Sequence, residues 1–281
     1  MLGWHPESRF FDVLVDGRHV RCHLVDAGPR DGRVVVLLHG IAVSSWAWRR
    51  NIDVLARGGL RVLAICQKGH GWSGRGPGDY DLPALSRFVL AALDRLQVPS
   101  ATWVGNSLGG AVSLWTALHH PARVERLVLI NPASHVEQLP WQALRSQVAA
   151  LAPVYRALVG PTLLRIPLAA IAYRNLPIDR DYMAGFWAPF EARGSMRALT
   201  ATARALPHEI EALDRRLGEV QQPTLIIWGE RDALLPVSGA YRLARKIPHA
   251  RLVLSPEAGH CPQEEEPERV NRLILDMARG G

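Results

Sequence analysis

The stretch Val-Gly-Asn-Ser-Leu-Gly-Gly, residues 104–110, sets a serine between glycines in the pattern G-x-S-x-G. A strand-like run precedes Ser107, and a run typical of a helix follows it. A sharp strand-to-helix turn exposes the middle side chain, and only small residues fit two places before and after it, here Gly105 and Gly109. The helix N-terminus favours a developing negative charge. The pattern therefore predicts that Ser107 is a nucleophile rather than an incidental serine in a glycine-rich turn.

A serine hydroxyl needs a base to take its proton, and the base needs a group that orients it. In this kind of turn the partners follow in chain order, acid and then histidine, in loops after later strands. Asp232 comes just beyond the apolar run Thr-Leu-Ile-Ile-Trp, and His260 follows the last strand-like run. Glu230 competes with Asp232, which could instead cap a turn or a helix. The other common place for the acid holds Asn131, which has no carboxylate, and this favours Asp232.

Acyl transfer also needs hydrogen-bond donors aimed at the developing oxyanion. One donor is expected to be the backbone N–H of Leu108, directly after the serine, and the other comes from the loop after the third strand. In that loop, Leu-Leu-His-Gly-Ile, Gly40 lets the chain turn close to the site, so the N–H of Ile41 is the expected second donor. His39 is predicted to be a structural residue of the loop rather than a second base.

The elements around these residues alternate between short apolar strands and helices, which predicts an α/β fold with a parallel sheet covered by helices. The chain opens with a predicted hairpin that turns at Asp16-Gly17. Between residues 134 and 216 the segments look helical, prolines separate them, and no strand-like run occurs. We therefore predict an α/β core of residues 1–133 and 217–281, interrupted by a helical cap over 134–216.

Composition narrows the class of protein. The chain has 281 residues, 48% of them hydrophobic, which suits one large domain or one domain with an insertion. The formal charge of +7 comes almost entirely from arginines interleaved with acids, since only Lys68 and Lys246 are lysines, and this argues against a nucleic-acid partner. Cys22, Cys66 and Cys261 show no C-x-x-C spacing, so neither a disulfide framework nor a cysteine metal site is expected.

The most apolar stretch, residues 148–173, is broken by Arg156, Arg165 and three prolines, so no membrane span is expected. The N-terminal residues lack a basic start followed by an apolar run, so we expect no secretion signal and a cytoplasmic protein. No metal-ligand spacing such as H-x-x-x-H with an internal glutamate occurs, and no cofactor is expected. The oligomeric state stays open, with a homodimer as one option.

With these residues in place the chain resembles the α/β-hydrolase superfamily from about residue 10 to 279, through the motifs LLHG, KGHGWSG, VGNSLGG, WGERD and AGHCPQEEEP. The resemblance implies a mostly parallel eight-stranded sheet flanked by helices, with a helical cap inserted after the sixth strand. Relatives often carry an aspartate and an arginine before the GHG loop, where this chain has Cys66, Gln67 and Lys68.

The elbow GNSLGG resembles that of hydrolases that cleave carbon–carbon bonds in ring-fission products. Those enzymes usually have a tryptophan directly after the catalytic histidine, where this chain has Cys261. A serine nucleophile argues against epoxide hydrolases and haloalkane dehalogenases, whose nucleophile is an aspartate. We therefore expect a serine hydrolase of small to medium hydrophobic carboxylic esters.

Several alternatives stay open. A carbon–carbon bond hydrolase of meta-cleavage-type diketone acids would need a cation for the substrate carboxylate, for which Arg174, Arg180 and Arg193 are candidates. An acyltransferase would use the same acyl-enzyme, and a ligand-binding receptor could use the same fold without turnover. Five aromatic residues are predicted either to line the acyl pocket or to form the core of the cap and its contacts: Trp46, Trp141, Tyr155, Phe186 and Trp187.

Overall fold

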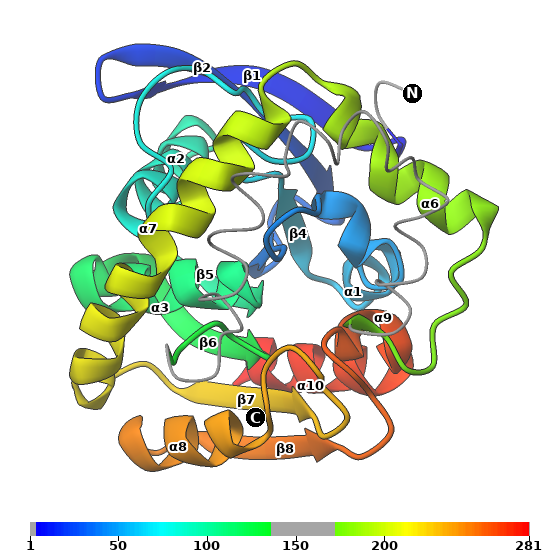
Figure 1. Ribbon diagram of the computed structural model, residues 1–281, viewed down its shortest axis with the longest axis vertical. Coiled ribbons are helices and arrows are strands. Elements are labelled where there is room, and N and C mark those ends of the chain that lie inside the picture. The colour runs from blue at the N-terminus through cyan, green and yellow to red at the C-terminus, as the bar shows by residue number, and fades with distance from the viewer. Residues whose placement is uncertain (1–3, 136–171, 281) are drawn as a thin grey trace.

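The computed structural model describes residues 4–135 and 172–280. Its strands form one eight-stranded sheet in the order β1-β2-β4-β3-β5-β6-β7-β8 (Figure 1). Only β1 with β2 and β2 with β4 pair antiparallel, so the mostly parallel sheet predicted from the sequence is confirmed. The strands are β1 Ser8–Val15, β2 Arg18–Ala27, β3 Val34–Leu38, β4 Arg61–Ile65, β5 Ala101–Asn106, β6 Val124–Ile130, β7 Thr224–Gly229 and β8 Arg251–Ser255.

The first two strands form the predicted hairpin. Asp16 and Gly17 join them with φ values of 49° and 72°. Positive φ at both central residues is the requirement of a type I′ turn, whose twist matches that of the two strands. The Asp-Gly pair therefore fixes the register in which Val15 pairs with Arg18.

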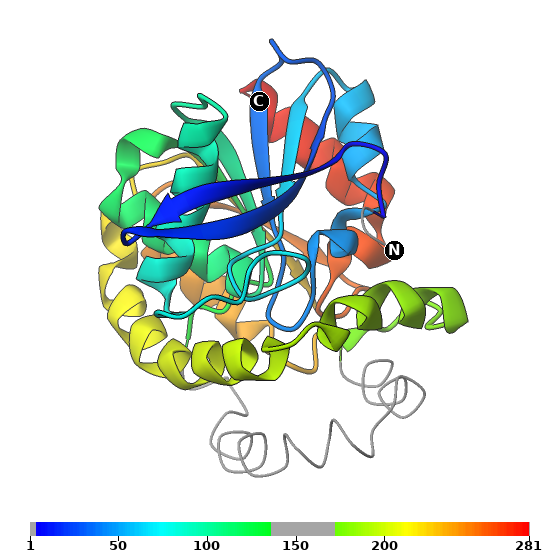
Figure 2. The same cartoon turned by 90° about the horizontal axis from the view of Figure 1, so that it is seen from above.

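Helices follow most strands and cover both faces of the sheet (Figures 1 and 2). The α-helices of the described residues are α1 Ile52–Arg57, α2 Leu82–Arg95, α3 Leu108–His119, α6 Arg180–Trp187, α7 Ser195–Arg216, α8 Ser238–Lys246, α9 Pro262–Glu265 and α10 Pro267–Arg279. Short 3₁₀ turns are η1 Ser45–Trp48, η2 Pro121–Arg123, η5 Ala188–Glu191 and η6 Leu217–Glu219.

The hydrophobic core has two halves, one on each face of the sheet. Along β3, Val36 and Leu38 pack with residues of α2, α3 and α8, whereas Val35 and Leu37 pack with residues of α1 and α10. A strand buried on both faces must be apolar at every position, which is why this strand is a continuous apolar run. The sheet is therefore a rigid platform, and the loops at the carboxyl ends of its strands are held in fixed places.

Two elements differ from the sequence prediction. The sequence from Ser44 to Gly58 has a pattern that predicts one helix ending at Gly58, but the chain forms η1 and then the short α1 there. The side chain of Asn51 lies between them and donates to Gln263 O and to Asn271 Oδ1, at 3.1 and 2.8 Å. This tertiary contact with the C-terminal part of the chain occurs where the helix is interrupted. The second difference is α9, a short helix before the terminal helix that the sequence analysis did not predict.

Between β6 and β7 the described residues form helices joined by irregular segments, and no strand. Asp179 caps α6 by accepting a hydrogen bond from Tyr182 N at 2.7 Å, and α7 follows after η5. In Figures 1 and 2, α7 runs past α3 and α6 lies near η1, and both pairs of elements are in contact. Trp141 and Tyr155 of the predicted pocket lie outside the described residues. Within the described ranges no helix is both long and apolar enough to cross a membrane.

Candidate active site

The predicted site residues come from loops at one edge of the sheet. Gly40 follows β3, Ser107 follows β5, Asp232 follows β7, and His260 follows β8. These four strands are parallel neighbours or next neighbours, so their carboxyl ends meet at the same edge. Ligands of open α/β sheets bind at this edge. The fold therefore brings together residues that are as far apart in the chain as 40 and 260.

Ser107 lies in the turn between β5 and α3 with φ 54° and ψ −116°, a strained conformation for a residue with a side chain. A Cβ atom on Gly105 would lie 2.3 Å from the backbone of Gly109, and one on Gly109 would lie 2.2 Å from Leu38 O. Both positions therefore admit only hydrogen. The backbones of β5 and α3 are therefore in close contact at Gly105 and Gly109. The turn between them places Ser107 in the lining of a cavity.

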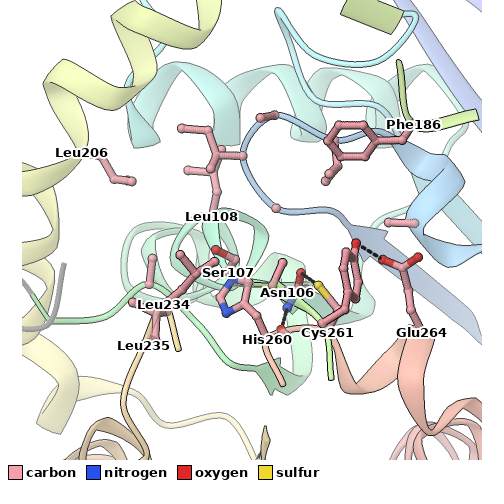
Figure 3. Close-up of a pocket in the computed structure, with 18 residues that line it drawn as sticks. Asn106, Ser107, Leu108, Phe186, Leu206, Leu234, Leu235, His260, Cys261 and Glu264 are labelled. Atoms are coloured by element: carbon pink, nitrogen blue, oxygen red, sulfur yellow. Dashed lines mark hydrogen bonds between the residues drawn. The ribbon is translucent and has the colours of Figure 1, made fainter. Parts of the chain in front are cut away.

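His260 and Asp232 are joined by a hydrogen bond of 2.7 Å between His260 Nδ1 and Asp232 Oδ2. A carboxylate only accepts, so Nδ1 carries the proton and Nε2 of the neutral ring is left as the acceptor. The His260 backbone is held as well, because its N–H donates to Ala172 O at 2.9 Å and its carbonyl accepts from Asn106 Nδ2 at 3.1 Å. Figure 3 shows the side chains of His260 and Ser107 beside each other in the cavity.

Asp232 is buried and charged. Burial by itself raises the pKa of a carboxyl, but neighbouring His260, the N–H of Leu235 and the amide of Asn131 outweigh it, and the pKa of Asp232 lies below its ordinary value. Its Oδ1 accepts from Leu234 N and Leu235 N at 2.7 and 2.9 Å. The carboxylate is therefore ionised at neutral pH and is held by both of its oxygens.

Asn131 belongs to the site, although the sequence analysis did not predict that it contacts the other site residues. Its Nδ2 donates to Asp232 Oδ2 at 2.6 Å, and its Oδ1 accepts from Gly229 N at 3.1 Å. Its φ of 40° turns the chain sharply after β6. The signal was present in the sequence, because Asn131 occupies the second common place for the acid. An amide there can still hydrogen-bond to an acid that comes from the next strand.

The competing residues lie elsewhere. Glu230 is exposed, and α8 begins at Ser238, so Asp232 caps the turn at Leu234 rather than that helix. His39 is fully buried, and burial together with the neighbouring His70 lowers the pKa of His39 to about 3. His39 therefore stays neutral, and its hydrogen bonds to Gly40 O and Gln67 N give it a structural role in the loop after β3. Gln67, which stands near the place where relatives often carry charges, donates to His39 O at 2.7 Å.

The two residues predicted to supply the oxyanion donors, Ile41 and Leu108, lie on segments next to Ser107. A Cβ on Gly40 would lie 3.2 Å from Ser107 Cβ, so the loop after β3 passes close to the serine. Ile41 and Leu108 both line the cavity, and Leu108 is the first residue of α3, where backbone N–H groups have no helical partner. Within the described residues neither N–H donates a hydrogen bond. That these two N–H groups bind an oxyanion stays a prediction of the sequence analysis.

The cavity has a volume of about 220 Å³. Among the described residues its lining is mostly apolar: Gly40, Ile41, Ala42, Val43, Ala47, Asn106, Ser107, Leu108, Ala133, Ala172, Tyr173, Phe186, Leu206, Leu234, Leu235, His260, Cys261 and Glu264.

The predicted aromatic pocket needs a correction. Phe186 lines the cavity, but Trp46 and Trp187 are not among the described lining residues. Trp46 packs edge-on against Tyr182, with ring centroids 5.0 Å apart, and the guanidinium of Arg49 lies 3.7 Å from its ring centroid. Trp46 therefore belongs to the contact between η1 and α6, which is the alternative the sequence left open.

Glu264 is the second lining residue that the sequence analysis missed. It lies on α9, four residues after His260, and its side chain is 1% exposed. It forms an ion pair with Arg49 and accepts a hydrogen bond from the Tyr173 hydroxyl at 2.9 Å. Burial raises the pKa of Glu264, and the ion pair with Arg49 opposes the rise. An acidic run such as Glu-Glu-Glu is usually solvated, and only its place after the histidine pointed to the cavity.

Comparison with known proteins agrees with this geometry. Residues 33–267 match the family profile described as alpha/beta hydrolase fold. The chain therefore belongs to the α/β hydrolase fold family, and the expected fold and superfamily are confirmed. Within the described residues no cluster of three or more metal-ligating side chains occurs.

Individual relatives differ in substrate. A 2-hydroxy-6-oxononadienedioate/2-hydroxy-6-oxononatrienedioate hydrolase of Burkholderia vietnamiensis is 30% identical over 97% of this chain and 96% of its own. A meta-cleavage product hydrolase of Pseudomonas fluorescens has 26% identity and a TM-score of 0.79, with 98% of this chain and 99% of that chain covered. The carboxylesterase CesB of Bacillus subtilis has 25% identity and a TM-score of 0.80, with 99% and 94% covered. Together they support hydrolase activity and leave the bond that is cleaved open.

Proposed function

We propose that this protein is a serine hydrolase in which Ser107 is the nucleophile, His260 the general base and Asp232 the residue that orients it. The observation that carries the proposal is the 2.7 Å hydrogen bond between His260 and Asp232 beside a strained serine at the mouth of an apolar cavity. The serine and the histidine are not hydrogen-bonded to each other within the described residues. Such contacts often tighten only when substrate binds.

In the proposed reaction Ser107 Oγ attacks a carbonyl carbon while His260 Nε2 takes the hydroxyl proton. Asp232 keeps His260 in the tautomer that can accept this proton and stabilises the imidazolium that forms. The N–H groups of Ile41 and Leu108 stabilise the oxyanion of the tetrahedral intermediate. His260 then returns the proton to the leaving group, and water hydrolyses the acyl-enzyme by the same steps in reverse order.

We propose a carboxylic ester with a small to medium apolar group as the substrate. The described lining supports this proposal, since Leu206, Leu234, Leu235 and Phe186 offer apolar contacts around the serine. Apolar pockets with a few convergent polar groups are typical of small-molecule sites. We further propose that residues 134–216 form a cap over the core of 1–133 and 217–281. Among the described residues its contribution to the pocket is Ala172, Tyr173, Phe186 and Leu206.

A second candidate is hydrolysis of a carbon–carbon bond in a meta-cleavage-type diketone acid. The 30% identical relative from Burkholderia vietnamiensis favours it, as does the elbow Gly-Asn-Ser. Such an acid would need a partner for its carboxylate. The arginines proposed from the sequence, Arg174, Arg180 and Arg193, are exposed and are not among the described lining residues. The site geometry therefore supports the ester better.

The test is hydrolysis of p-nitrophenyl esters from acetate to laurate by the wild type and by Ser107→Ala. We expect activity with an optimum at short to medium chains, and a loss of about a thousandfold or more in the variant, the scale seen when a triad member is removed. Equal activity of both proteins would refute Ser107 as the nucleophile. If both are inert on esters, the same pair is assayed on a 2-hydroxy-6-oxo-dienoate, and a fluorophosphonate probe tests whether the serine is activated at all. Product analysis with added alcohol separates hydrolysis from acyl transfer.

A further inference from the structure

The cavity wall carries a buried carboxyl group that the proposed reaction does not use. Glu264 lines the cavity with Cys261 and Tyr173, and it is separate from the pair of His260 and Asp232. Figure 3 shows Ser107 and His260 between two sides of the cavity, with Leu206, Leu234 and Leu235 on one side and Glu264 on the other. The two sides therefore differ in polarity.

The negative end of the ion pair faces the cavity. Arg49 binds Glu264 but is not among the described lining residues, and its guanidinium is held between the rings of Trp46 and Tyr182, at 3.7 and 5.0 Å from their centroids. Tyr173 donates to Glu264 Oε1 at 2.9 Å. A carboxylate has about four acceptor positions, and these two partners leave acceptor capacity unused. A substrate on this side meets the carboxylate rather than the guanidinium.

The side chain of Asn106 adds a second acceptor. Its Nδ2 donates to Ile130 O and to His260 O, both at 3.1 Å. Exchanging its oxygen and nitrogen would place Oδ1 against two carbonyl oxygens, so the orientation of the amide is fixed. Within the described residues the partner of Oδ1 is the Cys261 thiol at 3.9 Å, which is a weak donor. Asn106 Oδ1 is therefore available to a stronger donor.

Arg49 is the positive partner of Glu264, but it does not line the cavity among the described residues. Among the lining residues that the structure describes there is no arginine or lysine. The donors available in the same set are the serine hydroxyl and the N–H groups assigned to the oxyanion. A substrate carboxylate on the Glu264 side would thus face a like charge and an amide oxygen, in a site shielded from water where charge repulsion is strong.

We propose that Glu264 determines substrate specificity, selecting a substrate that carries a hydrogen-bond donor, such as a hydroxyl or ammonium group, on one side of the scissile carbonyl and excluding one that carries a carboxylate there. The proposal rests on the proposed hydrolase site and names its substrate class. The apolar side at Leu206, Leu234 and Leu235 receives the remaining group of the substrate.

The alternative is that the ion pair is structural and only ties α9 to η1. The two roles differ in what they do to ligand charge. A structural pair affects all ligands alike through stability, whereas a specificity residue changes the ratio between cationic and anionic ligands of the same size. The experiment therefore compares ligands of matched length that differ only in the end group.

Pentylammonium, pentanol and pentanoate are measured as competitive inhibitors of p-nitrophenyl butyrate hydrolysis, and their dissociation constants are measured by calorimetry with Ser107→Ala. The calorimetric measurement needs no turnover, so a failure of the hydrolase proposal and a failure of this one can be told apart. We expect the wild type to bind pentylammonium and pentanol at least about tenfold more tightly than pentanoate, because like-charge contacts are strongly penalised at a buried site.

The variant Glu264→Gln removes the charge and keeps the shape, and we expect it to reduce the preference for pentylammonium over pentanoate by about tenfold. Glu268→Gln is the matched control, since Glu268 is exposed on α10 and does not line the cavity, and its preference should equal that of the wild type. Equal or tighter binding of pentanoate to the wild type overturns the proposal, and so does an equal shift in both variants. If Glu264→Gln does not fold, the wild-type comparison decides alone.

Discussion

Asp232 Oδ2 accepts two hydrogen bonds, from His260 Nδ1 at 2.7 Å and from Asn131 Nδ2 at 2.6 Å. The two donors are neighbours around one oxygen atom. The end of the Asn131 side chain is therefore close to the ring of His260, although Asn131 follows β6 and Asp232 follows β7. A carboxylate at either of the two positions could orient the same histidine.

This arrangement predicts that the carboxylate that orients His260 can be transferred from position 232 to position 131. Asp232→Asn should lower kcat by roughly ten-thousandfold, because the neutral amide no longer enforces the reactive tautomer of the histidine. The double variant Asn131→Asp with Asp232→Asn restores a carboxylate beside His260 and should recover about tenfold or more of that loss, on the scale of the interaction energies between contacting residues.

The measurement is kcat on a p-nitrophenyl ester for the wild type, the single variants and the double variant. Asn131→Asp alone is the control, because it leaves Asp232 in place and adds a second carboxylate that competes for a proton. A double variant no more active than Asp232→Asn would show that the position of Asn131 cannot serve the histidine.

Among the site residues, the sequence predicted those whose position follows from chain order. It missed those whose role depends on contacts between distant parts of the chain. Ser107, Asp232 and His260 follow strands in the chain order typical of this fold, and the structure places them at one edge of the sheet. Asn131 and Glu264 act through neighbours that are distant in sequence, Asp232 and Arg49. No pattern of apolar residues marks such contacts, since they arise only when separate loops meet.

Among the elements, the junction of β5 with α3 leaves no room for a side chain at Gly105. Gly105→Ala would place a methyl group 2.3 Å from the backbone of Gly109, and backbone atoms cannot move away as a flexible side chain can. We expect Gly105→Ala to lower the free energy of unfolding by about 1–3 kcal/mol or more, as overpacking does, and to reduce kcat by displacing Ser107.

Gly76→Ala is the matched control. A Cβ on Gly76 meets nothing within 4 Å, so this variant should keep the stability and the activity of the wild type. Urea denaturation and ester hydrolysis measure the two effects for both variants. A Gly105→Ala protein as stable and active as Gly76→Ala would mean that the strand and the helix are not in contact as described.

The sequence predicted the elements best where they are buried on both sides. The central strands β3 and β7 consist almost entirely of apolar residues, and the predicted alternation of strands and helices is present around them. The prediction failed between Ser44 and Gly58, where Asn51 bonds to the C-terminal part of the chain and separates η1 from α1. A local helical pattern cannot anticipate a contact with residues more than 200 positions away.

For the whole molecule, the distribution of buried histidines determines how stability depends on pH. His23, His39, His70 and His135 are at most 4% exposed. Burial is the largest cause that lowers the pKa of each, to about 4 for His23, His70 and His135 and to about 3 for His39. Two carboxyls act in the opposite sense, because burial raises the pKa of Glu209 to about 7 and also that of Glu264.

Below the ordinary histidine pKa of 6.5, these four histidines are protonated in the unfolded chain but remain largely neutral in the folded protein. The unfolded state therefore gains relative stability as the pH falls from 6.5 towards 4. The carboxyls offset part of this loss, since the folded state takes up their protons first. We expect a net decrease in the free energy of unfolding between about pH 7.5 and about pH 5.0, with histidine as its main source.

His23→Leu isolates one contribution, because leucine fills a similar space between Phe10 and Trp72 and does not titrate. A shift of the pKa of His23 to about 4 corresponds to about 2 kcal/mol of stability lost between about pH 7.5 and about pH 5.0, and the variant should lose about that much less than the wild type. Guanidinium denaturation at the two pH values measures the difference, and the change in intrinsic stability caused by the substitution cancels from it. His249→Asn, at an exposed position with a φ of 58° that asparagine tolerates, should retain the wild-type dependence. If His23→Leu and His249→Asn show the same pH dependence, His23 takes up its proton as readily in the folded protein as in the unfolded chain.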